Sequence, residues 1–203
     1  MSKKPVPSRK TDEDTELIEA INAGHKERFY ELVERYESKL FNFGLRMCGN
    51  AADAEDMVQE TFLNVFKYLD GFRHETRFKN WVYKVAASTC LKKKRKSKYA
   101  PDRELSLEDF IPGKDERIAG EIPDWAMMPL EQLLNAELFT ELQNGISALP
   151  EKYRVVVVLR DVEGFSTVDT AQILNISVEN VKVRLHRARL FLRDHLKSYF
   201  KND

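Results

Sequence analysis

The sequence predicts an all-α fold in which two small helical domains are joined by a flexible acidic linker. Apolar residues recur at steps of three and four along most of the chain, which is the spacing of one helix face. β-branched residues never alternate with polar ones, as they would in a half-buried strand. A stretch that contains four of the seven prolines separates the two helical parts.

The composition argues against several classes of protein. Among 203 residues, 33 bases balance 33 acids, so the net charge identifies no partner. No apolar run approaches the roughly 18 residues of a membrane span, and the N-terminus lacks the apolar core of a signal peptide. The two cysteines lack CxxC spacing and the histidines are scattered. We therefore expect a cytoplasmic protein with reduced thiols, no membrane insertion, no metal and no cofactor.

The N-terminal part predicts a helical bundle. Residues 1–24 form a tail and a short amphipathic helix that ends at Gly24. A second helix covers about 25–48, and a third follows with Asp53 as its expected N-cap. After a loop, a fourth helix runs from about Thr76 to Lys98. The expected inward positions of the second and third helices are Phe29, Leu32, Val33, Tyr36, Leu40, Phe43, Met47, Ala54, Met57, Val58, Thr61, Phe62, Val65 and Leu69.

The linker is predicted at residues 99–129. Besides its prolines it is acidic, because residues 101–131 hold nine acids against three bases. Helical spacing resumes from Leu130 to Ile146, and Pro150 is placed in the first turn of the next helix. The valines of EKYRVVVVLRDVEG alone are also compatible with a strand, but their neighbours favour a buried helix.

A helix-turn-helix is predicted near the C-terminus. A short helix, Thr167 to Leu174, is followed by the turn NIS and a long helix. Asn175 tolerates a positive φ, Ile176 can fill the core and Ser177 can cap the long helix. The buried stripe of that helix is expected to be Val178, Val181, Leu185, Ala188 and Leu192. Basic side chains are left on its other faces, which suits a helix that enters the major groove of DNA, although a solvated basic helix is the simpler alternative.

The fourth helix of the first part also has features of a nucleic-acid surface. Trp81, Lys84, Val85 and Ser88 share one stripe, and six of the seven residues from Lys92 to Lys98 are basic. An exposed Trp beside cations can stack an unpaired base. Two other interpretations stay open here: a lone Trp often belongs to the core, and the basic run also fits a nuclear import signal or a solvated helix end.

Two segments resemble bacterial RNA polymerase sigma factors. DAEDMVQETFLNVFKYL with TRFKNWVYKVAASTCLKKKRK is similar to conserved region 2, and LPEKYRVVVVLRDVEGFSTVDTAQILNISVENVKVRLHRARLFLR is similar to region 4. Without a region 3 domain between them, the chain resembles the extracytoplasmic-function (ECF) group. The resemblance implies a region 2 domain at 25–98 and a region 4 domain at 130–203, which bind core RNA polymerase and direct promoter-specific initiation.

The resemblance also implies partners and their contact residues. The β′ clamp helices of core polymerase would bind Asp56, Gln59, Glu60, Phe62 and Phe66. The linker would thread through the basic active-centre cleft and RNA exit channel of the polymerase, whose β subunit is a further expected partner. The promoter −10 element would contact the loop 70–79 and Trp81, Lys84, Val85, Ser88, Lys92 and Lys93. The −35 element would contact Ser177, Lys182, Val183, Arg184, His186, Arg187 and Arg189. An anti-sigma factor is a further expected partner.

Some positions depart from the family's pattern. The family often has Asn at Ser88, Arg at Lys84, Ser at Val183 and Gly at Asn175. The promoter sequence therefore cannot be transferred from relatives. The family's YEEIA opening is TVDTA here, which weakens the expected capping pattern but keeps Ala171 for close packing.

Two rival functions follow from the same segments. One is a free-standing helix-turn-helix regulator that binds DNA without polymerase, and the other is a protein-interaction module. Catalysis is not expected, because we find no nucleophile–base pair, glycine-rich phosphate loop or metal spacing.

Overall fold

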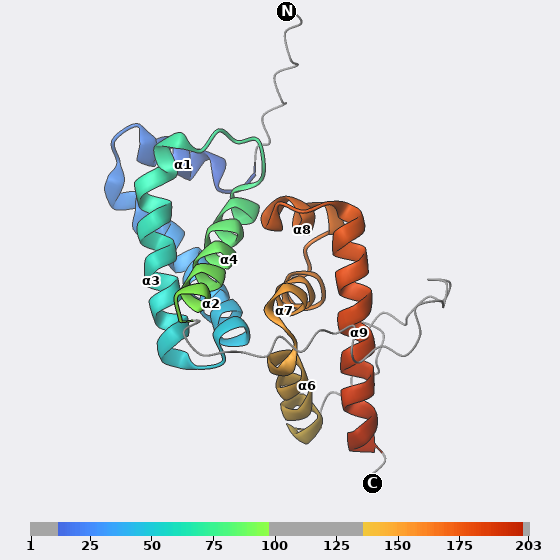
Figure 1. The fold of residues 1–203 in the computed structure, drawn as a ribbon. Coiled ribbons are helices and arrows are strands. Elements are labelled where there is room, and N and C mark those ends of the chain that lie inside the picture. Colours follow the sequence, from blue (N-terminus) through green and yellow to red (C-terminus); the bar gives the residue numbers. More distant parts are fainter. Residues whose placement is uncertain (1–11, 98–135, 201–203) are drawn as a thin grey trace, which may run out of the picture. The chain divides into compact units, whose positions relative to one another are not determined.

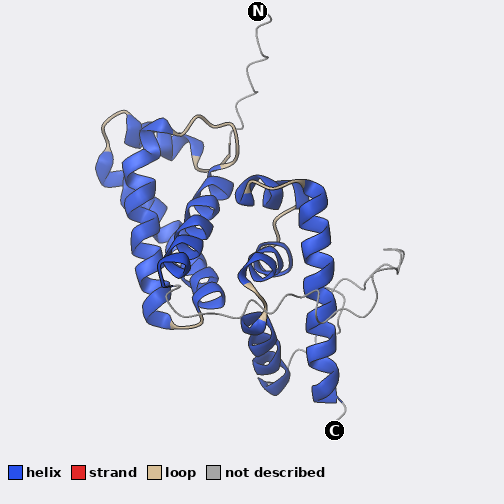
Figure 2. Ribbon diagram, viewed as in Figure 1, coloured by secondary structure: helices blue, strands red, loops and turns tan. Residues whose placement is uncertain are grey.

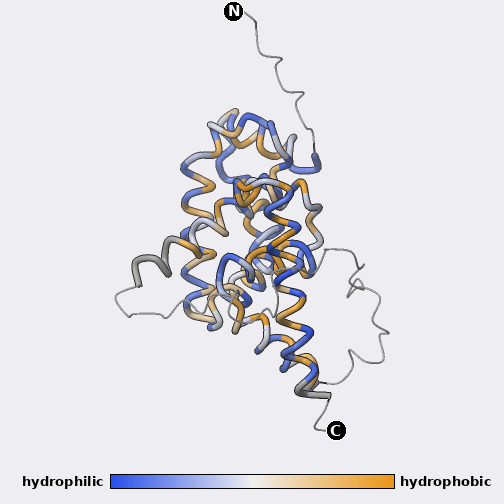
Figure 3. The backbone as a smooth tube through the Cα atoms, turned by 45° about the vertical axis from the view of Figure 1, so that its right-hand side comes forward, coloured by the Kyte–Doolittle hydropathy of each residue, from blue (hydrophilic) through white to orange (hydrophobic). Residues whose placement is uncertain are grey.

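A computed structural model of the chain describes residues 12–97 and 136–200, and the side chains of 12–91 and 138–197. Every regular element within these ranges is helical, which confirms the all-α prediction (Figure 2). The described residues form two compact units, divided between Lys93 and Lys94. The predicted linker, 99–129, lies outside the described residues. Along the helices of both units, apolar and polar stretches alternate (Figure 3).

From residue 12 onward, the described part of the first unit forms four α-helices (Figure 1). Helix α1 spans Thr15–Asn22, and a 3₁₀ turn at Lys26–Arg28 leads into α2, Phe29–Cys48. Helix α3 spans Ala51–Tyr68, and after a second 3₁₀ turn at Leu69–Gly71 the chain enters α4, Phe78–Ser97. Gly24 and Gly49 follow α1 and α2 with φ of 117° and 85°, conformations that favour glycine after a helix.

The core of the first unit follows the predicted stripes. Of the fourteen predicted positions, Phe29, Val33 and Phe62 are half-buried and the others are buried. Rings from α2 and α4 meet edge to face, Tyr36 with Phe78 at 5.7 Å and Phe43 with Tyr83 at 5.4 Å between centroids. These contacts join α4 to the α2–α3 pair.

The N-cap of α3 corrects the sequence prediction. Asn50, not Asp53, precedes the helix, and its side-chain oxygen accepts the Asp53 backbone N–H at 2.8 Å. Asp53 lies in the first turn, where its carboxylate accepts from the Asn50 amide at 2.7 Å. Two residues therefore share a reciprocal cap, in which an acid also opposes the helix dipole.

A close approach of α2 and α3 occurs at Gly44. A Cβ at this position would lie 2.6 Å from Cε of Met57 and 3.2 Å from Cα of Ala54. The Ala54 Cα belongs to the backbone of the facing helix and cannot move aside, whereas the flexible end of the Met57 side chain can. Glycine at 44 is therefore a packing requirement.

We expect Gly44→Ala to destabilise the first unit by about 1–3 kcal/mol, the usual cost of overpacking a dense core. The measurement is the free energy of unfolding in urea, followed by circular dichroism. Gly71→Ala is the matched control, since a Cβ at Gly71 meets nothing within 4 Å. Equal stability of the two variants would show that α2 and α3 can separate without cost.

In the second unit, the described residues 136–200 form four further α-helices (Figure 1). Helix α6 spans Ala136–Ala148 and α7 spans Glu151–Val157, which continues as one π-helical turn, Val158–Val162. Helix α8 spans Thr167–Leu174 and α9 spans Val178–Phe200. The valine-rich segment is thus a buried helix, as predicted, and not a strand.

Arg154 joins α6 to α7. Only 8% of this residue is exposed, and its guanidinium donates to the carbonyl of Leu149 at 2.9 and 3.2 Å and to that of Ser147. These carbonyls lie at the C-terminal end of α6, where a helix leaves acceptors without partners. Pro150 is the N-cap of α7, one residue before the predicted first-turn position.

Candidate functional site

The outer face of α3 carries the predicted polymerase-binding polar residues. Asp56, Gln59 and Glu60 are all exposed, whereas Met57 and Thr61, their neighbours in the sequence, are buried. The three side chains lie within about one turn of helix, so two carboxylates and one amide face outward together. Such a surface is suited to a basic partner.

An aromatic cluster lies at the C-terminal end of the same helix. Phe66 is 47% exposed, and its ring meets that of Phe29 at 5.0 Å, with the Lys26 ammonium 5.7 Å above the Phe66 ring. Phe62 is half-buried and packs edge to face on Phe29 at 6.4 Å. Leu63, which the sequence interpretation missed, is 71% exposed. It lies four residues after Gln59 and three before Phe66, so helical spacing alone could have identified it.

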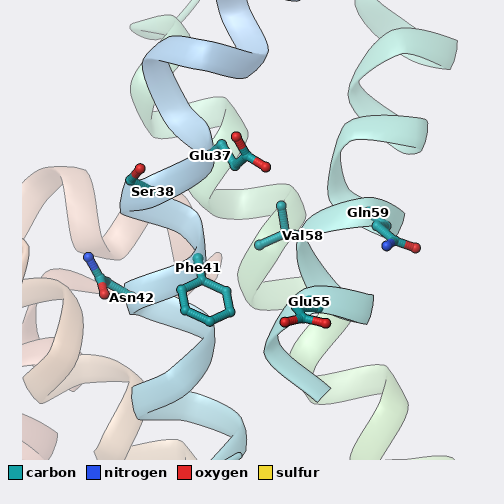
Figure 4. A pocket seen from close by; sticks show the side chains of 7 residues that line it. All are labelled: Glu37, Ser38, Phe41, Asn42, Glu55, Val58 and Gln59. Carbon is teal, nitrogen blue, oxygen red and sulfur yellow. The ribbon is translucent and has the colours of Figure 1, made fainter. Parts of the chain in front are cut away.

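A pocket of about 580 Å³ opens between α2 and α3 (Figure 4). Phe41 and Val58 give it an apolar part, and Glu37 and Glu55 carry carboxylates on either side. Gln59 also lines it, which makes the pocket continuous with the outer face of α3. The α2 residues of this pocket were not predicted as functional. An apolar floor between two acids suits a partner helix that carries both apolar and basic side chains.

Helix α4 separates a buried stripe from a more accessible one. Phe78, Val82, Ala86 and Thr89 are buried. On the neighbouring stripe, Lys84 and Ser88 are exposed, and Trp81 and Val85 are half-buried. The sequence predicted that this stripe contacts the promoter −10 element. The orientation of the helix leaves the stripe at least partly accessible. The backbone of Lys92 and Lys93 belongs to α4, but their side chains lie outside the described part of the chain.

Trp81 belongs to an aromatic cluster at the start of α4. Its ring lies 5.2 Å from that of Phe72 and 5.7 Å from that of Phe78, both tilted by about 40°. His74, in the preceding loop, packs on Phe72 at 4.7 Å and has a φ of 55°. The indole therefore packs against two rings of the core and is half-buried. The packing contribution of Trp81 is therefore observed, and its stacking on a base stays a prediction.

The N-terminus of α4 is capped by a residue from before α1. One carboxylate oxygen of Asp12 accepts the Phe78 backbone N–H at 2.6 Å, across 66 residues of sequence. Its other oxygen accepts from Thr15 Oγ1 at 3.1 Å and from the Asp14 backbone N–H at 3.2 Å. Asp14, 1% exposed, accepts the Tyr36 hydroxyl at 2.5 Å and pairs with Arg35. This arrangement fastens α1 to α2 and α4.

Its buried environment changes the pKa of the Tyr36 phenol. Burial and then the Asp14 hydrogen bond raise the pKa of the Tyr36 phenol above its usual value. The hydroxyl therefore remains a neutral donor to Asp14 through the neutral pH range.

We expect Asp12→Ala to cost about 1 kcal/mol of stability, the typical contribution of an N-cap, and to loosen the start of α4. Hydrogen exchange at the Phe78 amide would report the loss directly. Asp12→Asn keeps an acceptor and should restore most of the protection. Glu13→Ala, an exposed neighbour, is the control. Unchanged exchange at Phe78 in Asp12→Ala would contradict the capping role.

The turn between α8 and α9 has the predicted chemistry. Asn175 has φ 53° and ψ 48°, and the Ser177 hydroxyl accepts the Asn180 backbone N–H at 3.1 Å at the start of α9. Ile176 is half-buried. The start of α8 differs from expectation, because Ser166 Oγ accepts the Asp169 backbone N–H at 3.0 Å and donates to its carboxylate at 2.6 Å. The expected weakening is therefore not observed, because Ser166 and Asp169 cap the helix at its predicted start.

Helix α9 has a buried face and a basic face. Val181, Leu185, Ala188 and Leu192 are buried, while Val178 is half-buried. The remaining predicted DNA-binding residues lie on the accessible faces: Ser177, Lys182 and Val183 are exposed, and Arg184, His186 and Arg187 are half-buried.

Arg189 differs from the other predicted DNA-binding residues. Its guanidinium donates twice to the Asp161 carboxylate, at 2.7 and 3.0 Å, and both side chains are 15% exposed. Such a two-point pair fixes the orientation of both groups. Asp161 belongs to the π-helical turn after α7, so the pair joins this turn to α9. Sequence spacing gave no signal for this contact, since the partners lie 28 residues apart.

The described residues contain neither a candidate metal site nor a candidate membrane span. Among the described side chains, no group of three or more His, Cys, Asp or Glu residues could hold a metal ion. None of the helices in the described ranges has the length and apolar character needed to cross a membrane.

Comparisons with known proteins agree with this geometry. Residues 32–99 match the family model for sigma-70 region 2, and residues 139–192 match that for sigma-70 region 4. The ECF RNA polymerase sigma factor SigW of Bacillus subtilis (strain 168) is 33% identical over 182 residues, which cover 89% of this chain and 95% of SigW. The RNA polymerase sigma-H factor of Pseudomonas aeruginosa is 30% identical over 181 residues, covering 88% and 91%.

Solved structures show the same fold at lower identity. CnrH, determined in complex with the cytosolic domain of CnrY, has a TM-score of 0.64 and 22% identity, covering 92% of this chain and 99% of CnrH. The sigma factor RpoE of Bartonella quintana, determined with the anti-sigma factor NepR, has a TM-score of 0.58 and 22% identity, covering 83% and 96%.

Proposed function

The chain belongs to the ECF RNA polymerase sigma factors, and from this premise we propose how its residues perform promoter recognition. As a sigma factor it acts in transcription initiation: it binds core RNA polymerase and directs it to specific promoters. In the proposal, the region 2 domain spans residues 25–98 and the region 4 domain spans 130–203. Each contacts a different promoter element, and residues 99–129 connect them.

The polymerase contact is assigned to the outer face of α3. Asp56, Gln59 and Glu60 supply charge and hydrogen bonding, and Phe62 and Phe66 supply apolar area to the β′ clamp helices. Leu63 joins this surface, because its 71% exposure leaves a large apolar side chain uncovered between Gln59 and Phe66. The pocket between α2 and α3 extends the surface toward α2 (Figure 4).

The −10 contact is assigned to the accessible stripe of α4 and the loop before it. Trp81 offers a supported aromatic face on which a base that has left the duplex can stack. Lys84, Val85 and Ser88 continue the surface along the helix, and Lys92 and Lys93 would meet phosphates. The cap from Asp12 holds the start of this helix in place.

The −35 contact is assigned to the start of α9 and its basic face. Ser177, Lys182, Val183, Arg184, His186 and Arg187 would approach the major groove, in which bidentate contacts from Arg discriminate between bases. For Arg189 we propose an indirect role: through Asp161 it would orient α9, and contact a phosphate only if that pair opens.

The linker is long enough to span the distance between the two promoter elements. Promoter elements two helical turns apart lie about 70 Å from each other, at roughly 34 Å per turn. About thirty residues can reach up to ~100 Å when extended. The acidic excess of residues 101–131 favours a path along basic polymerase surfaces, including the β subunit, over a path along DNA.

The proposal also covers the cellular location of the chain and its regulation by a protein partner. The chain acts in the cytoplasm, carries out no catalysis of its own and is held inactive by an anti-sigma factor. That partner is supported by the sigma factor RpoE, which has the same fold and was determined with the anti-sigma factor NepR. CnrH, also of this fold, was determined with the cytosolic domain of CnrY.

A gel-shift experiment tests this function against the free-standing regulator. Promoter DNA is incubated with the chain, with core polymerase and with both. We expect a specific, salt-resistant shift only when both proteins are present. A specific shift of the same affinity by the chain alone would favour the rival function. The observation that carries our proposal is the pairing of an exposed acidic face on α3 with a helix-turn-helix in the same chain.

A further inference from the structure

The two cysteines of the chain lie side by side in the first unit. Cys48 is the last residue of α2, and Cys90 lies in the C-terminal half of α4. Their sulfur atoms are 3.9 Å apart, although the two residues lie 42 positions apart in the sequence. They are not joined by a disulfide in this structure. Neither residue contributes to the proposed polymerase or promoter contacts.

The proximity of these thiols is a consequence of helix packing. Tyr36 contacts Phe78, Phe43 contacts Tyr83 and Cys48 contacts Cys90, so partners advance along α2 and α4 in the same direction. The thiol pair is therefore the last of a series of contacts between two parallel helices. Because the aromatic pairs fix the register, the sulfurs stay close whenever the core is intact.

The two thiols differ in access. Cys90 is 5% exposed, whereas Cys48 is half-buried at a helix end. A small oxidant can therefore reach Cys48 first. A disulfide requires the sulfurs to approach to about 2.05 Å, which is about 2 Å closer than they are now. A side-chain rotation at Cys48, before the turn at Gly49, can supply part of this movement.

We infer that Cys48 and Cys90 form a reversible peroxide-sensitive disulfide. The Cys48 thiolate attacks one oxygen of hydrogen peroxide, the O–O bond breaks, and Cys48 sulfenic acid and water result. The Cys90 thiolate then attacks the Cys48 sulfur, the S–O bond breaks, and the S–S bond forms with release of the second water. Two electrons pass from the thiols to the peroxide, and both thiol protons end in water.

The bond would link the helix that carries the −10 surface to the helix pair that carries the polymerase surface. It closes a loop of 42 residues in the unfolded chain and so favours the folded unit. A dithiol restores the reduced state by exchange. Oxidants would in this way control how rigidly α4 is held against α2.

The test uses the full chain, first reduced, then treated with a small molar excess of hydrogen peroxide and alkylated with iodoacetamide. We expect a mass loss of about 2 Da per chain, no alkylation and a Cys48–Cys90 cross-linked peptide. The melting temperature should rise by about 5–15 °C, and dithiothreitol should reverse every change. Cys48→Ser and Cys90→Ser should show neither the mass loss nor the higher melting temperature.

Three results would overturn the inference. In the first, both thiols of the treated protein remain open to alkylation. In the second, the product is a cross-linked dimer. In the third, the mass rises by about 32 Da per cysteine, as sulfinic acid formation predicts. The wild-type protein alone decides between these outcomes, so a folding defect in either serine variant would not obscure the answer.

Discussion

A Glu60→Lys variant is expected to lose association with core RNA polymerase and to keep its fold. Glu60 is exposed on α3 beside Gln59 and one turn from Asp56. Reversal of its charge places a cation in a surface that we assign to a basic partner, and like charges in an interface cost several kcal/mol. We expect the affinity for core enzyme to fall at least ~100-fold, measured by a competition assay against the unmodified chain.

Two further variants distinguish an effect of the α3 site from an effect of the net charge of the chain. Glu60→Gln removes the charge without reversing it, so its loss of affinity should be smaller. Glu16→Lys makes the same change on α1, upstream of the residues that match region 2, and should bind core enzyme normally. Equal circular dichroism and melting would establish that all three variants are folded. Normal binding by Glu60→Lys would refute the contact assignment on α3.

An Arg187→Ala variant is expected to lose discrimination at one base pair of the −35 element. Arg187 is half-buried on the accessible side of α9, next to the buried Ala188. A bidentate contact from Arg to a base is worth about 1–3 kcal/mol of discrimination, or roughly 5–150-fold in relative affinity. The measurement is the binding of the holoenzyme to a panel of promoters that differ at single −35 positions.

The pattern across the panel identifies the kind of contact. Loss confined to one position indicates a base contact. A uniform loss across all promoters, with a weaker salt dependence, would reduce Arg187 to a phosphate contact. Arg193→Ala is the matched control, because Arg193 lies on the same helix, is exposed and donates to Asp194 at 3.2 Å. It should change neither specificity nor salt dependence.

Local features of the structure were predictable from the sequence. Helix α8 has the predicted bounds, and Asn175 and Ser177 adopt the predicted turn conformation and cap. The outward stripe of α4 was also found from spacing alone. These features depend on residues within one or two helical turns of each other, and side-chain periodicity and turn chemistry report such relations directly.

Contacts between distant residues were not predictable. The Asp12 cap of α4, the Arg189–Asp161 pair and the Cys48–Cys90 contact join residues 66, 28 and 42 positions apart. Helical periodicity identifies which face is buried but not which partner covers it, so these pairings needed the fold. Arg189 is an example. Its charge and position predicted a contact with DNA, but in the structure its guanidinium pairs with the Asp161 carboxylate.

Charge is distributed according to the proposed partners. Acids lie on the outer face of α3 and in residues 101–131, whereas bases gather on α9 and after Cys90. The total is zero because the two groups cancel, although each surface alone is strongly charged. A sigma factor needs both signs, since it binds DNA and a protein that itself binds DNA.

The most direct test of a two-unit promoter reader is transcription by core polymerase on genomic DNA, with and without the chain, followed by sequencing of transcript 5′ ends. The account predicts new start sites that appear only with the chain, share two sequence elements about two helical turns apart and disappear with Glu60→Lys. Unaltered start sites in the presence of the folded chain would contradict it.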